Sequence, residues 1–139
     1  MELELSLYRY AIPFTEPITV KQQRLVTRDG LVLALTSATE AVTAFGEIAP
    51  LFGLHSETLE QAEAQLVTLF ATPHTTFARI MEAQLYPSVR TGLEMAIHNF
   101  TAVRSGALPS FGTTPHNAEQ VPVNALLFGA SNEVVARAE

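Results

Sequence analysis

Hydrophobic and polar residues alternate along the first part of the chain. Three leucines fall on one face of residues 2–10, and glutamate and serine fall on the other. A period of two predicts a strand with one buried face. The apolar runs at residues 31–36 and 41–48 predict two more strands. Their order along the chain predicts a three-stranded antiparallel meander.

Turn-forming residues separate these runs. Pro13 and Pro17 lack the N–H group that a strand ladder uses, so we expect a loop that runs to about Arg28. Asp29–Gly30 predicts a tight turn before the second strand. A second turn is expected at residues 37–40.

The hydrophobic period then lengthens to three or four residues, which predicts helices. The first is expected at residues 57–70 with Ser56 as its N-cap, followed by a shorter helix at residues 76–84. A third should begin after Ser88 and end near Gly106. Its expected apolar stripe consists of Val89, Leu93, Ile97, Phe100 and Val103.

The last part of the chain has a different character. Residues 106–120 are rich in Pro, Gly, Ser and Thr, which predicts a connector between domains. The nearly continuous apolar run at residues 121–129 suits a strand buried on both faces, and Ser131 can cap a helix after it. We therefore expect a folded unit over residues 1–105, a connector over 106–120, and the truncated start of a larger α/β domain over 121–139.

Composition excludes several classes of function. The net charge of −6 and the absence of a basic cluster argue against a nucleic-acid partner and against a membrane surface. No apolar run approaches the roughly 20 residues of a membrane span. There is no cysteine, which excludes disulfides and thiolate chemistry. The N-terminus lacks a signal peptide, so a cytoplasmic location is expected.

No catalytic or metal-binding set is found among the residues themselves. The four histidines lack metal-ligand spacing, and phosphate-binding and nucleophile motifs are missing. Glu57, Glu60 and Glu63 are interpreted as a solvated helix edge. Glu47 is interpreted as a structural partner for an arginine or for loop amides. Lys21 is the single lysine, so a mechanism needing two cannot run on this chain alone.

One loop is unusually apolar. Residues 49–56, here called the apolar loop, carry Leu51, Phe52 and Leu54 between Pro50 and the following helix. Loops are usually polar because their backbone groups must reach water. The composition leaves two explanations: another element buries the loop, or the loop forms a wall against a ligand.

Several motifs resemble a known family. The stretches at residues 9–13, 24–31 and 46–58, together with Pro87–Val89 and residues 121–127, look like the opening of o-succinylbenzoate synthases. These are enolase-superfamily enzymes of the muconate-lactonizing-enzyme-like subgroup. The resemblance covers essentially the whole chain. It implies an N-terminal α+β capping domain, a three-stranded meander plus helices, leading into the first βα unit of a modified TIM barrel.

The resemblance also implies an activity. Such enzymes are Mg²⁺-dependent dehydratases, that is, carbon–oxygen lyases, of menaquinone biosynthesis. They convert 2-succinyl-6-hydroxy-2,4-cyclohexadiene-1-carboxylate to o-succinylbenzoate. A barrel lysine removes the proton alpha to the substrate carboxylate, and Mg²⁺ stabilises the enediolate. The lysines and metal ligands of the family match no position before Glu139, so this chain is not expected to be active alone.

Two loops of the capping domain shape substrate specificity in this superfamily. They correspond here to about residues 14–28 and to the apolar loop. We expect Arg24 to provide a polar contact to a small-molecule carboxylate substrate, and Leu51, Phe52 and Gly53 to form an apolar wall. The expected partner is the missing barrel, or a second copy through exposed apolar surface.

Two alternatives stay open. The same cap and barrel serve dipeptide epimerases, N-acylamino acid racemases and cycloisomerases. From a different class, the chain could be a non-catalytic α+β binding module.

Overall fold

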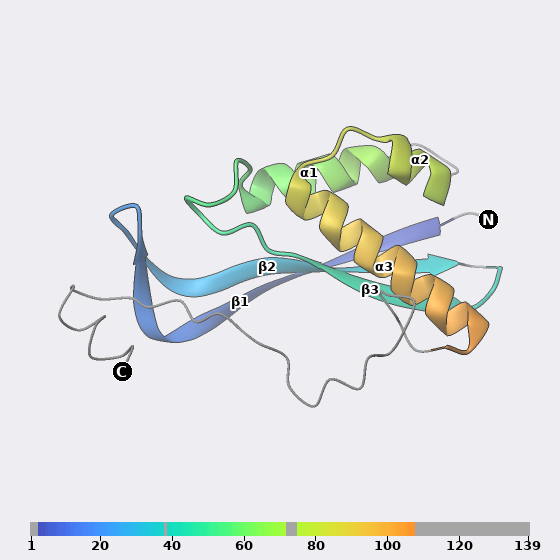
Figure 1. The fold of residues 1–139 in the computed structure, drawn as a ribbon, viewed down its shortest axis with the longest axis horizontal. Helices are drawn as coiled ribbons and strands as arrows, with labels where there is room; N and C mark the ends of the chain where they lie inside the picture. Colours follow the sequence, from blue (N-terminus) through green and yellow to red (C-terminus); the bar gives the residue numbers. More distant parts are fainter. Residues whose placement is uncertain (1–2, 38, 72–74, 108–139) are drawn as a thin grey trace, which may run out of the picture.

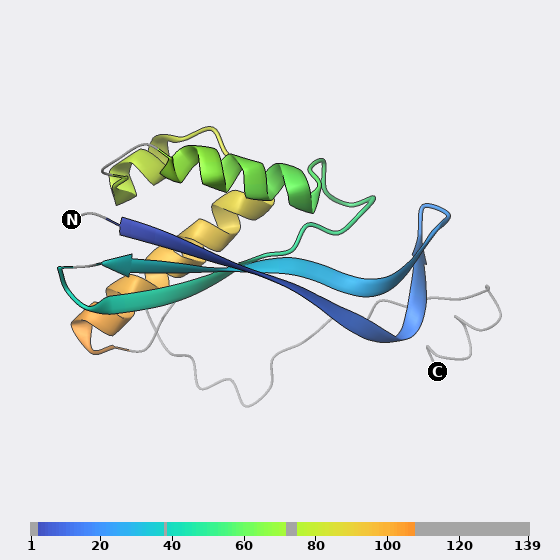
Figure 2. The same cartoon turned by 180° about the vertical axis from the view of Figure 1, so that it is seen from behind.

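The chain folds into a sheet with one helical layer. The computed structural model describes residues 3–37, 39–71 and 75–107. Strands β1 (Leu3–Val20), β2 (Gln23–Ser37) and β3 (Val42–Ile48) form an antiparallel sheet in the order β1-β2-β3. Helices α1 (Leu59–Phe70), α2 (Phe77–Glu82) and α3 (Pro87–Ser105) complete it. Figures 1 and 2 show α3 running across one face of the sheet, with α1 and α2 beside it. The predicted meander and helices are confirmed.

The first two strands continue far beyond the predicted turn at Asp29–Gly30. They stay paired to a hairpin tip at Lys21 and Gln22, seen at the end of the long ribbon in Figure 1. Both tip residues have positive φ angles, 45° and 66°. That backbone, as in a type I′ turn, matches the twist of the flanking strands. The predicted loop up to Arg28 and the predicted turn after it are therefore wrong.

Two features allow β1 to stay paired with β2 although it contains Pro13 and Pro17. β1 is an edge strand, so N–H groups on one of its sides need no partner. The register also shifts between Pro13 and Ile18, where residues 14–17 lie opposite Val26 alone. This bulge takes up Pro17. Gly30 lies within β2 rather than in a turn. Glycine is needed there because the Tyr10 ring lies over it, and a Cβ would overlap the phenol.

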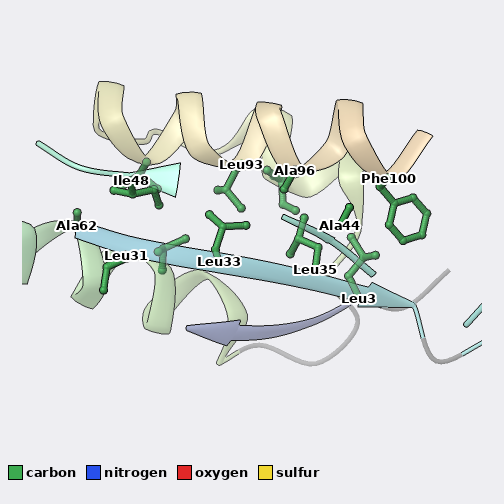
Figure 3. Close-up of a cluster of buried hydrophobic side chains, with 13 residues drawn as sticks. Leu3, Leu31, Leu33, Leu35, Ala44, Ile48, Ala62, Leu93, Ala96 and Phe100 are labelled. Carbon is green, nitrogen blue, oxygen red and sulfur yellow. The ribbon is translucent and has the colours of Figure 1, made fainter. Parts of the chain in front are cut away.

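The hydrophobic core lies between the sheet and the helices. Leu31, Leu33 and Leu35 alternate along β2 and are fully buried on the helical side, because every second side chain of a strand points to the same face. Figure 3 shows them facing α3. The other core side chains are Leu3, Ala44, Ile48, Ala62, Leu66, Ile80, Val89, Leu93, Ala96 and Phe100. Val103, predicted for the stripe of α3, is instead 53% exposed.

Helix α1 begins later than predicted. Its N-cap is Thr58, whose hydroxyl accepts the N–H of Gln61 while the Gln61 side chain accepts the N–H of Thr58. This capping box satisfies two helix-end donors at once. The predicted cap, Ser56, instead donates its hydroxyl to Glu57. The predicted end at Phe70 is confirmed.

Helix α3 begins at Pro87, so Ser88 lies in its first turn rather than at the cap. Gly106, at the C-terminal end, has the left-handed φ of 68° that favours glycine there, as predicted. The predicted strand and helix within residues 121–139 lie outside the described residues, as does the connector beyond residue 107. Among the helices of the described ranges, none is long and apolar enough to cross a membrane.

Two glycines bring α3 close to β3. A Cβ on Gly46 would overlap the carbonyl oxygen of Gly92, and a Cβ on Gly92 would overlap the side chain of Ile48. Only hydrogen atoms fit at these two positions, so the helix backbone rests directly on the strand. This contact places the end of β3, and with it the start of the apolar loop.

Candidate functional site

A hollow of about 910 Å³ opens where the hairpin meets the apolar loop. Its lining comes from β1 and β2 between residues 9 and 29, from residues 50–58, and from the first turn of α1. Basic side chains from Arg9, Lys21 and Arg28 lie on this lining together with apolar Leu51 and Phe52. The lining also carries Asp29, Glu57 and Glu60, so the hollow combines charged groups of both signs with an apolar wall, as sites for polar organic ligands do.

The hairpin tip and the apolar loop touch at Gly53. This glycine has a φ of 81°, and a Cβ added to it would lie 3.0 Å from Val20 Cγ1 and 3.2 Å from Lys21 Cδ. Both the backbone conformation and the close packing therefore favour glycine. The two segments that sequence reasoning treated as separate loops form one continuous side of the hollow.

Arg28 holds the start of the apolar loop. Its guanidinium donates one hydrogen bond to the carbonyl of Ala49 and another, of 3.4 Å, to the carbonyl of Pro50. The ladder between β2 and β3 ends at the Leu31–Ile48 pair. Pro50 cannot donate an N–H to extend it. Beyond the last backbone pair, the Arg28 side chain therefore provides the hydrogen bonds that connect β2 to the segment after β3.

The middle of the apolar loop closes on itself. The carbonyl of Leu51 accepts the N–H groups of Leu54 and His55, each at 3.1 Å. The N–H of Leu51 in turn donates to Nδ1 of His55 at 3.0 Å. This turn exposes the neighbouring side chains: Phe52 is 50% exposed and Leu54 71%. Among the described residues, the loop therefore forms an apolar surface that no other element covers.

Glu57 holds the far end of the loop, and here the sequence-based interpretation is wrong. Glu57 is only 4% exposed, and its carboxylate accepts hydrogen bonds from both the N–H and the hydroxyl of Ser88. Burial raises the pKa of Glu57, but the hydrogen bonds from Ser88 and Ser56 outweigh it and lower the pKa to about 2. Glu60 and Glu63, by contrast, lie at the surface and pair with Arg9 at 3.5 and 2.6 Å.

Glu47 has a tyrosine as its partner. The Tyr10 hydroxyl, reaching across Gly30, donates to a carboxylate oxygen of Glu47. Burial and this hydrogen bond raise the pKa of Tyr10 to about 12. A structural role for Glu47 was predicted, but an arginine or loop amides were expected as the partner.

The predicted site residues fall in two places. Leu51, Phe52 and Gly53 line the hollow. Arg24 is exposed and is not among the lining residues, whereas Arg28, on the same strand, is. Whether any of the four contacts a substrate stays a prediction. The sequence analysis did not predict that Arg28 holds the apolar loop. The one hint in the sequence was the position of this arginine, just before the part of β2 that pairs with β3.

The described residues offer no place for a divalent ion. Within residues 3–37, 39–71 and 75–107, no three His, Asp or Glu side chains gather closely enough to hold a metal. Acid–base work would need groups that face one another across the hollow. Two of its three acidic groups instead contact protein partners, Glu57 contacting Ser88 and Glu60 contacting Arg9, and the third is Asp29. The arrangement is suited to shaping a ligand site.

Comparison with solved structures defines the class of fold. The o-succinylbenzoate synthase from Thermosynechococcus elongatus BP-1, described as complexed with Mg in the active site, superposes with a TM-score of 0.57 and 28% identity, covering 70% of this chain and 29% of that one. The L-Ala-D/L-Glu epimerase from Bacillus subtilis gives a TM-score of 0.62 at 17% identity, over 76% of this chain and 32% of that one, which shows the fold alone. The sheet and helices are a capping domain of the enolase superfamily.

Sequence comparison gives the family. The family described as MenC, N-terminal domain, matches residues 3–100, and the chain belongs to it. The o-succinylbenzoate synthase of Vibrio cholerae serotype O1 (strain M66-2) is 40% identical over 91 residues, and that of Haemophilus influenzae (strain ATCC 51907) is 32% identical over 99.

The matched part covers 66% and 69% of this chain in those two comparisons. It covers only 26% and 29% of the two relatives. The chain therefore spans between a quarter and a third of their length.

Proposed function

We propose that these residues form the capping part of a Mg²⁺-dependent o-succinylbenzoate synthase. The activity is loss of water from 2-succinyl-6-hydroxy-2,4-cyclohexadiene-1-carboxylate in menaquinone biosynthesis. The observation that carries the proposal is the family match over residues 3–100, because that range contains every segment that builds the hollow. A cytoplasmic location fits such an enzyme.

The role of this segment is to close one side of the substrate site. Leu51, Phe52 and Gly53 supply an apolar wall for the cyclohexadiene ring, and Lys21 at the hairpin tip supplies a cation on the lining for a substrate carboxylate. Closing such a wall excludes water and strengthens the electrostatic interactions inside. We keep Arg24 as a proposed polar contact, made at the exposed flank of the hairpin.

Catalytic chemistry is assigned to none of these residues. Mg²⁺, by family, would stabilise the enediolate that forms when the proton alpha to the carboxylate is removed. The described residues do not fit the ion, so no step in our proposal passes through it here. We propose that the barrel of a longer polypeptide provides the base and the metal ligands.

Turnover by the complete polypeptide that carries these residues tests the function. We expect release of o-succinylbenzoate from the cyclohexadiene substrate with Mg²⁺, and loss of activity on chelation. Phe52→Ala should raise KM about tenfold, because an apolar contact worth about 1.5 kcal/mol is lost. Val67→Ala is the matched control: Val67 is 57% exposed on α1 and away from the hollow.

The same assay separates the alternatives. Epimerisation of a dipeptide, with no release of o-succinylbenzoate, would move the protein to another enzyme of the superfamily. A folded 139-residue chain that sediments as a stable monomer, from a gene with no barrel-coding region in frame or adjacent, would favour a binding module.

A further inference from the structure

Both hydrogen bonds that Arg28 makes within the described residues go to the backbone of the apolar loop. Its two terminal nitrogens donate to the carbonyls of Ala49 and Pro50, and within the described residues it forms no ion pair. A charged donor makes stronger hydrogen bonds than a neutral one, and a planar guanidinium fixes two acceptors at once. The side chain is partly buried, so water competes for these carbonyls less than at the surface.

The carbonyls that Arg28 holds come immediately before the apolar wall. Leu51 follows Pro50 directly, and its carbonyl accepts the N–H groups of Leu54 and His55 that close the turn. At the other side of the turn, Gly53 packs against Val20 and Lys21 of the hairpin tip. Arg28 belongs to the same hairpin. The β1–β2 hairpin thus contacts the loop at two points, through Arg28 at Ala49 and Pro50 and through its tip at Gly53. Phe52 lies between these points in the sequence.

We propose that Arg28 is a positioning residue that sets the place of Phe52 and so the fit of the ligand against the apolar wall. This inference rests on the proposed function for its ligand, but its structural part does not. Arg28 does not need to touch the substrate: removing it frees the carbonyls of Ala49 and Pro50 and lets the wall move away from the hairpin.

The structural part is tested by amide hydrogen exchange in the 139-residue chain. In Arg28→Met we expect about tenfold faster exchange at the amides of Leu54 and His55, since their turn loses its tether. The Leu33 amide, in the core ladder, should keep its protection, which shows that the fold is intact. Arg24→Met is the matched control, because that exposed arginine on the same strand makes no hydrogen bond or ion pair in the described part of the chain.

A conservative variant guards against a loss of folding. Arg28→Lys keeps the charge but cannot hold two carbonyls in a fixed geometry, so exchange should be intermediate. Wild-type exchange at Leu54 and His55 in both Arg28 variants, or in Arg28→Lys alone if Arg28→Met does not fold, would overturn the proposal.

The functional part is tested by a double-mutant cycle in the complete enzyme. We expect Arg28→Met to raise KM about tenfold with kcat within about threefold of wild type, as for Phe52→Ala. Because Arg28 acts through Phe52, the double variant should be no worse than Phe52→Ala. Multiplicative losses would show direct contact between Arg28 and the substrate, and would overturn the positioning role.

The exchange experiment and the kinetic experiment can fail independently of each other. Arg79→Met, on the exposed side of α2, should leave KM unchanged and controls for charge. If the wild-type enzyme made no o-succinylbenzoate, the proposed function would fail, while the exchange experiment would still decide whether Arg28 positions the loop.

Discussion

The carboxylate of Glu57 accepts two hydrogen bonds from Ser88, one from its backbone N–H and one from its hydroxyl. Ser88 lies in the first turn of α3, where N–H groups have no partner within the helix. The N-cap residue, Tyr86, makes no side-chain cap. Glu57 therefore caps α3 from a distant part of the chain and ties that helix to the end of the apolar loop.

This pairing predicts a loss of stability in acid. The folded-state pKa of Glu57, about 2, lies below its ordinary value of 4.5. Its contribution, about 3 kcal/mol at roughly 1.4 kcal/mol per pKa unit, is present above pH 4.5 and disappears as the pH falls towards 2. Glu57→Gln should unfold more easily at neutral pH and lose this part of the acid dependence. Chemical denaturation between pH 2 and 6 measures both; an unchanged acid profile in the variant contradicts the prediction.

Tyr10 predicts the opposite behaviour in alkali. Its pKa is raised from 10 to about 12 by burial and by the hydrogen bond to Glu47. The stability it contributes is present below pH 10 and is lost as the pH rises through about 12. An absorbance titration should show a late tyrosine step that Tyr10→Phe removes. Persistence of that step in the variant would assign it to another tyrosine.

The capping box of α1 predicts a contrast between two neighbouring hydroxyls. Thr58→Ala should lower the free energy of unfolding by about 1 kcal/mol, because the Gln61 N–H loses its acceptor. Ser56→Ala removes a hydroxyl whose hydrogen bond, within the described part of the chain, goes to Glu57, and it should cost less. Thermal or urea unfolding compares the two. Equal losses would show that the helix end does not depend on Thr58.

The contact between Gly46 and Gly92 predicts a steric effect. Gly46→Ala would drive a methyl group into the backbone of α3 and should cost about 3 kcal/mol, as overpacking of a core does. Gly106→Ala provides the control. Nothing lies within 4 Å of its added Cβ, so only its positive φ is penalised, by about 1 kcal/mol. A reversed order in urea denaturation would be inconsistent with close packing of α3 on β3.

Arg24 is tested by the complete enzyme. If its guanidinium reaches the substrate carboxylate, Arg24→Met should raise KM by about tenfold, and Arg24→Lys should restore part of the loss, because it returns the charge without the planar fork. KM values equal to wild type in Arg24→Met would remove this residue from the site and leave Lys21 as the proposed cation for the substrate carboxylate.

Local patterns predicted the elements whose stability is local. The alternation along residues 2–10, the end of α1 and the left-handed Gly106 follow from the properties of neighbouring residues, and all are confirmed. The type of fold also agrees with expectation. That Leu51, Phe52 and Gly53 form a wall against a substrate stays a prediction.

The failures have a different origin. The ribbon continued past Pro13 because an edge strand tolerates missing donors, which depends on strand order in the finished sheet. Glu57 reads as a first-turn carboxylate because its partner, Ser88, lies 31 residues away. The role of Arg28 likewise depends on carbonyls that only the folded sheet brings near.

The hairpin tip gives the molecule a natural attachment point for a probe. Lys21 is the single lysine in the sequence, and it is exposed beside Gly53, where the ribbon meets the apolar loop. In this 139-residue chain, apart from the N-terminal amine, a reagent for primary amines has one target, and that target lies on the lining of the hollow. A fluorophore on Lys21 of this chain would sense the packing of the hairpin tip on the apolar loop without any substitution in the chain.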